Sequence, residues 1–498
     1  MVAVGLPVDP PHAPSASTVL ALGGGALASW AAGCSSGEPQ KAPGPEPDPD
    51  PKPDPNQPWW LSGNFAPVDE SEAMGLEVIG SIPSQLSGLF ARNGPNPFFG
   101  DTGHWFLGDG MIHGLRLSGG DASWYRARYV QTPVLGVEPM EGIGPPDLVK
   151  HQANTSLVHH ADRLMALLEI GLPYELSTSD LTTMGVHDFG GDLAGPMTAH
   201  PKVDPVTGEL VFFGYSVLGA PYLTYHAVDA QGQLTRSEDI EVPAAAMMHD
   251  FQVTATHVVF MFLPILFDFD LALEGDAFPF RWDTSHGARI GVMPREGTNA
   301  DVEWFDVEPC YMFHTFNAFN DPNDPDKVIL DGVRYPELWV ETSDDFEAPS
   351  TMWRWEMTLG EGVSEGPWSD LAAEFPRIDP RRQGSDYRYG YAVTALTGSG
   401  VTAGFNPPDA IVKLDVETGS ESVHQLADGM RMGEAVFVPA SESAAEDEGW
   451  LMGFTYDEQS DTSELVIVDA QNMESEAVAR VKLPTRVPYG FHGQWVAD

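Results

Sequence analysis

Cysteine is scarce in this sequence, and its scarcity limits the chemistry that the chain can perform. Two cysteines occur among 498 residues, which excludes a disulfide framework and a zinc ribbon built from thiolates. Cys310 lies in the apolar run CYMF and is therefore expected to be a small buried side chain. Long apolar runs are absent too, since none offers the roughly 18 consecutive apolar residues of a membrane-spanning helix.

Basic residues are also few. The chain has 25 Lys and Arg against 73 Asp and Glu, a formal net charge of −48. Such a surface repels phosphate backbones and anionic lipid head groups, so no nucleic-acid partner is expected. The acidic residues are spread along the whole chain, which leaves two explanations open: adaptation to high salt, which screens self-repulsion, and a compositional bias of the lineage.

The first 58 residues lack the pattern of a folded domain. Residues 17–37 form a short apolar stretch that ends in small residues at Cys34, and AAGC resembles a bacterial lipoprotein cleavage box. This pattern predicts export and a lipid anchor on Cys34. No basic residue precedes Lys41, however, so an unprocessed leader of a cytoplasmic protein stays open as the alternative.

The expected domain organisation follows from composition. Residues 1–34 are the signal-like leader, and residues 35–58 are a Pro/Asp-rich tether that cannot pack a core and should be extended. The folded domain is predicted to occupy residues 59–498.

Helical signals are few after residue 59, whereas strand signals are common. Short β-rich runs such as VFFGYS, LTYHAVDA, DAIVKLDV and ELVIVDA alternate with turn sequences such as DPVTGE, DAQGQ and DVETGS. A long all-β chain of this kind favours one closed array of blades over several sandwiches. The segments 262–288 and 342–378 are expected to be loops or short helices inserted on one face.

Four of the fifteen histidines lie in or beside apolar segments: His200, His249, His314 and His492. Successive members are 49, 65 and 178 residues apart, so only the fold could bring them together, as the axis of a propeller does. Four neutral imidazoles suit Fe(II), Cu, Ni or Zn. The spacing alone nevertheless favours four unrelated buried histidines.

The surrounding motifs resemble a known family. GLFARNGPNPFF, HWFLGDGMIHGLRL, TAHPKVDPVTGEL, MMHDFQVT, FHTFNAF, EFPRIDPRR, EAVFVPA, EDEGW and GFHGQW occur in this order between residues 88 and 496. They are similar to the motifs of the carotenoid cleavage oxygenase (retinal pigment epithelial membrane protein-like) family. Its members include carotenoid and apocarotenoid dioxygenases, stilbene-cleaving dioxygenases and a retinoid isomerohydrolase. The resemblance covers about residues 60–498.

The resemblance implies a fold and a metal site. The fold is a seven-bladed β-propeller with a helical and loop dome over an axial site. The catalytic Fe(2+) is then held by His200, His249, His314 and His492. Three glutamates should accept hydrogen bonds from three of the imidazoles, which fixes each ring's tautomer and orientation. They are Glu169, Glu374 and Glu434, with Glu175 as the alternative to Glu169.

The resemblance also implies an activity. The protein is expected to be a monomeric dioxygenase that uses O2 to cleave a conjugated C=C bond of a carotenoid or apocarotenoid into two carbonyl products. Stilbene-cleaving relatives engage a phenol with Tyr and Lys. Gly103 precedes HWFLGDGM and RYVQTPVLGVE has no Lys, which leans towards a carotenoid. Stilbene cleavage, isomerisation and a non-catalytic ligand-binding propeller stay open.

Apolar side chains near the motifs should line a substrate tunnel. The candidates are Phe98, Phe99, Trp105, Phe106, Phe313, Phe316, Phe319 and Phe491. The unusually apolar run 258–275 should begin as a core strand, VVFMF. Its LPILF portion then forms either an apolar lip that dips into lipid or part of the core.

Overall fold

The turn sequences form hairpins, as predicted. The turn at 229–233 joins β12 (Leu223–Val228) to β13 (Leu234–Ile240). The Asp229 carboxylate accepts hydrogen bonds from two backbone N–H groups of this turn, and Gly232 supplies a positive φ of 85° that other residues rarely adopt. Asp and Gly at these positions therefore fix the register of the hairpin.

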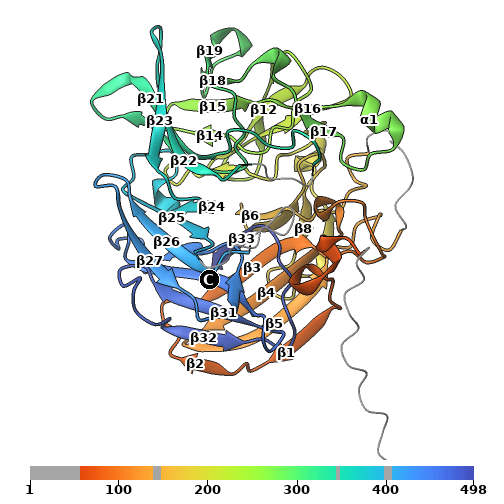
Figure 1. Ribbon diagram of the computed structural model, residues 1–498, viewed down its shortest axis with the longest axis vertical. Helices are drawn as coiled ribbons and strands as arrows, with labels where there is room; N and C mark the ends of the chain where they lie inside the picture. Colours follow the sequence, from red (N-terminus) through yellow and green to blue (C-terminus); the bar gives the residue numbers. More distant parts are fainter. Residues whose placement is uncertain (1–56, 138–146, 344–347, 397–406) are drawn as a thin grey trace, which may run out of the picture. The chain divides into compact units, whose positions relative to one another are not determined.

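The computed structural model describes residues 57–137, 147–343, 348–396 and 407–498. The leader with Cys34 and nearly all of the tether lie outside the described residues. Within these residues, seven antiparallel sheets of four or more strands surround a common centre (Figure 1). We number them blades 1–7, so the predicted seven-bladed propeller is confirmed.

The first three blades are described from the innermost strand outwards. Blade 1 contains β33 (Gly493–Ala497), β3 (Gly88–Pro95), β4 (Gly110–Ser118), β5 (Asp121–Tyr129) and β1 (Ser71–Met74). Blade 2 contains β6 (Ser156–His160), β7 (Arg163–Leu167), β8 (Tyr174–Leu176) and β9 (Thr183–Val186). Blade 3 contains β10 (Lys202–Val203), β11 (Leu210–Tyr215), β12 and β13.

The next three blades have four strands each. Blade 4 contains β14 (Gln252–Val253), β15 (His257–Phe262), β18 (Arg289–Pro294) and β19 (Glu303–Asp306). Blade 5 contains β20 (Thr315–Asp321), β21 (Asp324–Arg334), β22 (Thr351–Thr358) and β23 (Gly362–Ser369). Blade 6 contains β24 (Glu374–Ile378), β25 (Tyr389–Thr394), β26 (Ala410–Asp415) and β27 (Ser420–Gln425).

Blade 7 and blade 1 close the ring by combining distant parts of the chain. Blade 7 contains β28 (Met430–Met432) and β29 (Val436–Pro439), both paired with β30 (Gly449–Asp457), followed by β31 (Thr462–Asp469), β32 (Ala479–Lys482) and β2 (Val78–Gly80). In blade 1, the C-terminal β33 pairs with β3, so Val496 lies opposite Leu89. The N-terminal strand β2 thus completes blade 7, and the C-terminal strand β33 completes blade 1. These two antiparallel pairings hold the ends of the propeller together.

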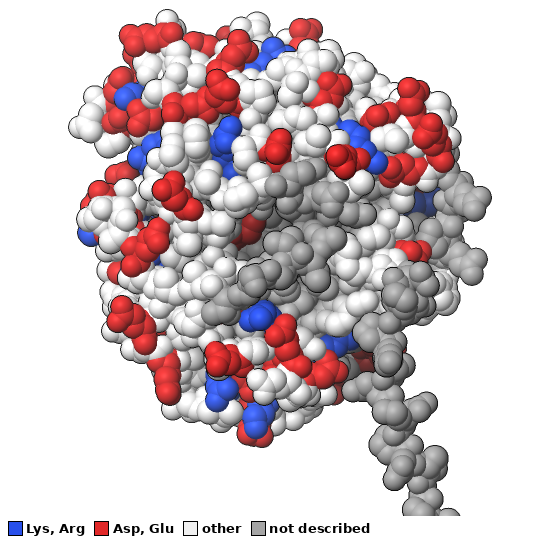
Figure 2. Space-filling view, in the orientation of Figure 1, with Lys and Arg blue, Asp and Glu red and all other residues white. Residues whose placement is uncertain are grey.

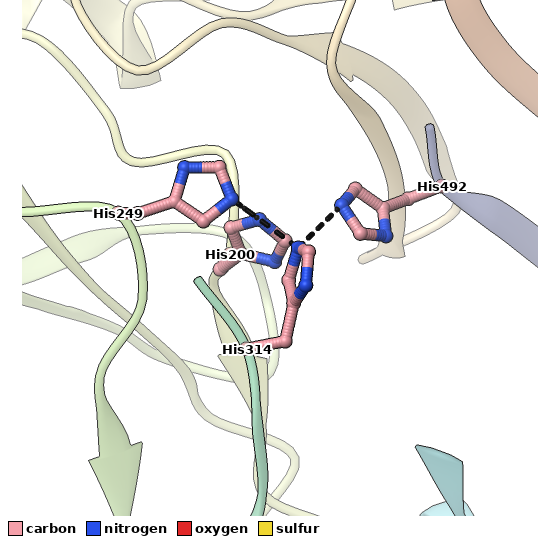
Figure 3. A group of neighbouring side chains, drawn as sticks. All are labelled: His200, His249, His314 and His492. Atoms are coloured by element: carbon pink, nitrogen blue, oxygen red, sulfur yellow. Dashed lines mark hydrogen bonds between the residues drawn. The ribbon is translucent and has the colours of Figure 1, made fainter. Parts of the chain in front are cut away.

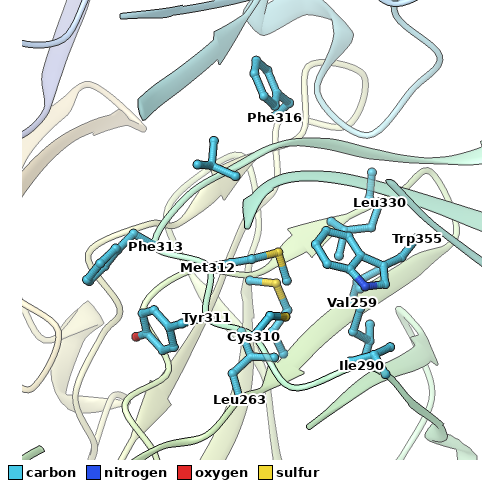
Figure 4. Packing of buried hydrophobic residues seen from close by; sticks show 14 of the residues in the cluster. Val259, Leu263, Ile290, Cys310, Tyr311, Met312, Phe313, Phe316, Leu330 and Trp355 are labelled. Carbon is cyan, nitrogen blue, oxygen red and sulfur yellow. The ribbon is translucent and has the colours of Figure 1, made fainter. Parts of the chain in front are cut away.

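Side chains packed between blades form the core. Between blades 4 and 5, Val259 and Ile290 meet Leu330 and Trp355, and all four side chains are almost fully buried (Figure 4). Cys310 is fully buried in the same cluster, as expected. Each large apolar side chain buried in this way stabilises the fold by about 1.5–3 kcal/mol. Packing between sheets, rather than helices, therefore holds the inner strands in place.

One expectation about the inserts is wrong. The segment 342–378 does not form loops or short helices in its described residues, because it contains β22, β23 and the start of blade 6. β23 reads GVSEGPWS and none of its residues is buried, since it is the outermost strand of its blade. An edge strand that packs little apolar surface lacks the alternation by which strands are recognised.

The segment 262–288 contains a short helix and loops, as predicted, together with two short strands. It holds the two-stranded sheet of β16 (Ile265–Phe267) and β17 (Phe280–Trp282), with α1 (Phe269–Glu274) between them. α1 is the one α-helix among the described residues, so no extended helical dome is present in that part of the chain. Short 3-10 turns supplement the loops: η1 (Trp59–Leu61), η2 (Gly63–Phe65), η3 (Trp105–Leu107), η4 (Phe189–Gly191), η5 (Thr284–His286), η6 (Asn299–Asp301) and η7 (Pro380–Arg382).

The surface reflects the acidic composition. Figure 2 shows acidic side chains distributed over many blades of the visible face, with fewer basic side chains among them. On this face the acidic charge is thus spread out rather than gathered in a single patch. Among the described residues, no helix has the length and apolar character required to cross a bilayer.

Candidate metal centre

The four predicted histidines converge at the centre of the propeller. His200, His249, His314 and His492 each lie one to three residues before an innermost strand, namely β10, β14, β20 and β33. Figure 3 shows their imidazole rings pointing toward one another from separate elements. Equivalent ends of four blades therefore bring together side chains that are far apart in the sequence.

The Nε2 atoms form a tight cluster. The Nε2 atom of His249 lies 3.0 Å from that of His200 and 3.3 Å from that of His314, and the His314 and His492 Nε2 atoms are 3.1 Å apart. The four candidate ligand atoms all lie within 4.8 Å of one another. No other group of histidine, cysteine, aspartate and glutamate residues with this geometry occurs in the described part of the chain.

Three of the rings are held by the three predicted glutamates. The His249 Nδ1 atom contacts Glu169 Oε1, the His314 Nδ1 atom lies 2.7 Å from Glu374 Oε2, and the His492 Nδ1 atom lies 2.9 Å from Glu434 Oε1. A carboxylate at Nδ1 keeps the proton there, so the lone pair at Nε2 stays available.

The fourth ring, that of His200, and the alternative glutamate, Glu175, do not take part in such a pair. In the described residues, no carboxylate is recorded at the ring of His200. Glu175, the alternative to Glu169, lies away from the cluster on β8, where its carboxylate contacts Arg163 and His187. Glu169 is therefore the residue that the structure brings to the histidines.

The donor set fits a divalent metal ion. With Nδ1 protonated, the Nε2 lone pairs face one another and cannot form hydrogen bonds among themselves. A cation at their centre would satisfy all four. A bound imidazole nitrogen lies about 2.1 Å from a divalent ion such as zinc. Two such nitrogens whose bonds to the ion form a right angle therefore lie roughly 3.0 Å apart. The observed separations of 3.0–3.3 Å match this spacing.

Burial and charge set the protonation states. Burial lowers the pKa of His200 well below its usual value, and it lowers that of His492 to about 4 although Glu434 opposes it. For His249, burial also lowers the pKa, but the charge of Glu169 outweighs it and raises the value. Burial raises the pKa of Glu374, yet the charge of His314 and several hydrogen bonds hold it below its ordinary range. Ionised carboxylates and neutral rings favour metal binding, so His200, His492 and Glu374 are held in the binding state, whereas at His249 a metal ion competes with a proton.

A large apolar cavity opens onto this cluster. Its volume is about 1620 Å³, and three of the histidines, His249, His314 and His492, form part of its wall. Five of the aromatic residues predicted for a tunnel line it: Phe99, Trp105, Phe106, Phe313 and Phe491. The cavity can therefore hold a long apolar molecule against the cluster.

Three other tunnel candidates do not line the cavity. Phe98 is 46% exposed and packs against Phe99. Phe316 and Phe319 lie on β20, where Phe316 contacts Trp368 inside the blade and lies apart from Phe313 (Figure 4). Side chains of an inner strand point into the packing between blades, whereas Phe313 precedes the strand and stays at the cavity. The prediction was wrong because the motif contains both kinds of position.

Several further residues at the site were not predicted from the sequence. Thr155 lines the cavity and precedes β6, so it occupies in blade 2 the place that histidines occupy in four other blades. Its carbonyl oxygen accepts a hydrogen bond of 3.3 Å from the His492 backbone N–H group. Tyr215, Phe278, Tyr335 and Phe375 also line the cavity. Position before an innermost strand is the signal that could have identified Thr155.

A glycine packed against the cavity-lining residue His151 provides a test of this packing. A Cβ atom on Gly171 would overlap the His151 ring. That ring cannot move freely, because its Nε2–H donates to Leu172 O at 2.9 Å and its Nδ1 accepts from the Ala153 N–H at 3.2 Å. Gly171→Ala is therefore expected to lower the unfolding free energy by about 1–3 kcal/mol, measured by denaturant unfolding. Gly195→Ala, which meets no neighbour, should change it little; equal stability of both variants would contradict the prediction.

Comparison with known proteins places the fold and the site in one family. The family model of the retinal pigment epithelial membrane protein matches residues 65–497. The chain belongs to this family. The resemblance predicted from the nine motifs is thus confirmed.

Members of the family are similar to the chain over most of their length. A protein named carotenoid cleavage oxygenase from Mycobacterium tuberculosis is 38% identical, covering 88% of this chain and 97% of its own. The crystal structure of Pseudomonas brassicacearum lignostilbene dioxygenase superposes with a TM-score of 0.80 at 29% identity, covering 88% of this chain and 98% of its own. Cobalt-substituted Synechocystis apocarotenoid oxygenase superposes with a TM-score of 0.76 at 30% identity, covering 86% and 96%.

Proposed function

We propose that this protein is an Fe(2+)-dependent dioxygenase that cleaves a conjugated C=C bond of a carotenoid or apocarotenoid with O2 to give two carbonyl products. The observation that carries the proposal is a cluster of four imidazoles, of which three are oriented by carboxylates and line an apolar cavity of about 1620 Å³. Relatives named for carotenoid and apocarotenoid cleavage support the substrate class.

The side chains bind and orient, and they need not transfer protons. A bound ferrous ion would supply the oxygen-binding and one-electron chemistry that side chains lack. The glutamates hold the imidazoles in one orientation, and the Phe313 ring packs edge-on against His249 with centroids 5.4 Å apart. The aromatic wall would exclude water and hold one double bond beside the cluster. Because an alkene and O2 together contain every atom of two carbonyl products, no acid or base is required.

The polar groups of the cavity favour a polyene over a phenol. In the described residues, Lys150 is the one lysine that lines the cavity, and its ammonium group lies 2.9 Å from Asp147 with 62% of the side chain exposed. The hydroxyl groups of Tyr215 and Tyr335 donate to Glu169 and Glu374. A phenolic stilbene would therefore find no buried lysine near the cluster, which supports the carotenoid over the stilbene alternative.

The proposal is tested with protein purified anaerobically and loaded with Fe(II). The loaded protein is incubated with O2 and a panel of a full-length carotenoid, an apocarotenal, a hydroxystilbene and a retinyl ester. Paired carbonyl fragments from a carotenoid or apocarotenal are expected by liquid chromatography and mass spectrometry. Fragments from the stilbene alone, or an isomerised retinoid without O2 consumption, would replace the proposal with an alternative. Iron-loaded protein that leaves every substrate intact would indicate a non-catalytic binding protein.

We further propose that the rim of the cavity contacts a membrane, where such substrates dissolve. The LPILF portion does not form the predicted apolar lip that would dip into lipid, because Ile265 and Leu266 are buried. The exposed apolar residues follow it on α1, where Phe269 is 55% and Leu273 is 73% exposed while Ala272 between them lines the cavity. The lipid anchor predicted on Cys34 would serve the same purpose.

Binding to neutral vesicles tests the contact by α1. Phe269→Ser/Leu273→Ser is expected to weaken binding to phosphatidylcholine vesicles, measured by sedimentation, by about thirtyfold or more, because each removed side chain loses roughly 1 kcal/mol or more of apolar burial in lipid. Val206, which is 90% exposed outside the cavity lining, provides the control Val206→Ser. Equal binding of wild type and both variants would exclude α1 as a membrane contact.

A further inference from the structure

Each of the three glutamates at the cluster has a second donor, and these donors differ in charge. The Tyr215 hydroxyl donates to Glu169 Oε2 at 2.5 Å, and the Tyr335 hydroxyl donates to Glu374 Oε1 at 2.9 Å. Glu434 is instead held by a guanidinium group. Two carboxylates therefore have neutral partners, whereas the third has a cationic one.

Two N–H groups of the Arg377 guanidinium bind the two oxygens of the Glu434 carboxylate. Its Nε–H donates to Glu434 Oε1 and its Nη2–H donates to Glu434 Oε2, each at 2.8 Å. Planar guanidinium groups match carboxylates in this bidentate geometry. Glu434 is almost fully buried, and the Arg377 side chain is 32% exposed but does not line the cavity. The cation thus contacts both oxygens of the carboxylate and shares Oε1 with the His492 ring.

Arg377 also connects the strands that close the ring. It lies on β24 of blade 6, and its Nη2–H also donates to Gly493 O of β33 in blade 1 at 3.0 Å. Glu434 lies two residues before β29 of blade 7. The Gly493 N–H donates in turn to Glu434 Oε2 at 2.6 Å. One side chain therefore fixes the relative positions of three neighbouring inner strands beside His492.

The charges in direct contact with the cluster balance only when Arg377 is included. Three ionised glutamates carry three negative charges, of which a divalent ion would neutralise two. Arg377 supplies the third positive charge. Lys202 and Asp250, which follow two of the histidines, pair with each other at 2.7 Å and add no net charge. Uncompensated charge is costly in a buried site.

We propose that Arg377 is a positioning and charge-balancing residue that keeps the bound iron in the ferrous state; this inference rests on the proposed function. A carboxylate at Nδ1 increases the basicity of its imidazole and so favours the more highly charged ferric ion. Arg377 draws negative charge away from His492 and limits this effect. Without Arg377, the ion should lose one electron more readily to O2, which becomes superoxide.

The first experiment measures oxidation of bound Fe(II) in air without substrate, followed by the ferric electron paramagnetic resonance signal. Arg377→Met is expected to oxidise about tenfold faster than wild type, whereas Arg377→Lys, which keeps the charge, should stay within about threefold. Arg354→Met is the matched control, because Arg354 makes an equivalent bidentate pair with buried Asp331 at 2.7 Å outside the cluster. Oxidation in Arg377→Met as slow as in Arg354→Met would overturn the proposal.

A second pair of variants separates charge from structure. Arg377→Met/Glu434→Gln removes both charges and should return the oxidation rate to within about threefold of wild type. Glu434→Gln alone leaves an excess positive charge and should oxidise more slowly than wild type, which keeps the proposal testable if Arg377→Met does not fold. Equally fast oxidation in all Arg377 and Glu434 variants would show a purely structural role and refute charge balancing. Absence of iron from the wild type would instead refute the proposed function.

Discussion

Replacing His314 by alanine is expected to abolish metal binding and oxygenase activity together. The His314 Nε2 atom lies 3.3 Å from that of His249 and 3.1 Å from that of His492, so its removal opens the middle of the cluster. The buried Glu374 carboxylate also loses its 2.7 Å partner. Changes in residues that merely orient ligands cost about 10- to 100-fold in metal affinity or activity, so loss of a ligand should exceed this range.

The measurement is iron per protein after anaerobic loading, together with substrate turnover. His226→Ala is the matched control, because His226 is a buried histidine whose Nδ1 atom lies 2.8 Å from Ser237 Oγ, away from the cluster. That variant is expected to lose stability but to keep its iron. Full iron occupancy and turnover in His314→Ala would remove the basis of the proposed function.

Local sequence predicted the inner parts of the blades but not their edges. Runs such as LVFFGY became fully buried strands, because apolar residues between Asp and Gly turns leave few other conformations that bury them. β23 was missed, since an outermost strand packs on one side only and its sequence is not constrained to alternate. Strand prediction thus failed where burial, the physical origin of the pattern, is weakest.

The histidine cluster could not be derived from spacing. His314 and His492 are 178 residues apart, yet their Nε2 atoms are 3.1 Å apart because β20 and β33 enter the same axis. Family motifs identified the four residues and their glutamates before the fold was known. The motifs do not indicate which way each side chain points, so Phe316 was assigned to the tunnel together with Phe313.

Hydrogen-bond partners of the glutamates were also beyond prediction. Tyr215 and Arg377 lie on strands of blades 3 and 6, and Tyr335 directly follows β21 of blade 5. Nothing in their local sequence distinguishes them from neighbouring residues. The two tyrosines bind the carboxylate oxygen that the histidine leaves free, and Arg377 binds both oxygens of Glu434, so their importance depends on where each buried carboxylate lies. Such a requirement appears only when the positions of both groups are known.

Removing residues 490–498 is expected to cost the metal, the activity and much of the stability of the fold. These residues contain His492 and β33, which pairs with β3 through five residue pairs and supplies the innermost strand of blade 1. Phe491 and Val496 are 8% and 6% exposed. Burying each such side chain stabilises the fold by about 1.5–3 kcal/mol, a large share of a typical total of about 5–15 kcal/mol.

The point variant His492→Ala separates the two effects of this truncation. It retains β33 and its pairing with β3, so it should lose iron while its thermal unfolding midpoint falls much less than that of the truncated chain. Iron content and thermal unfolding are measured on both proteins side by side. Gly490 explains why the segment tolerates little change, because a Cβ atom there would lie 2.7 Å from the Arg92 guanidinium carbon. A truncated chain that keeps both its iron and its unfolding midpoint would contradict the assignment of β33 as the strand that closes the ring and of His492 as a metal ligand.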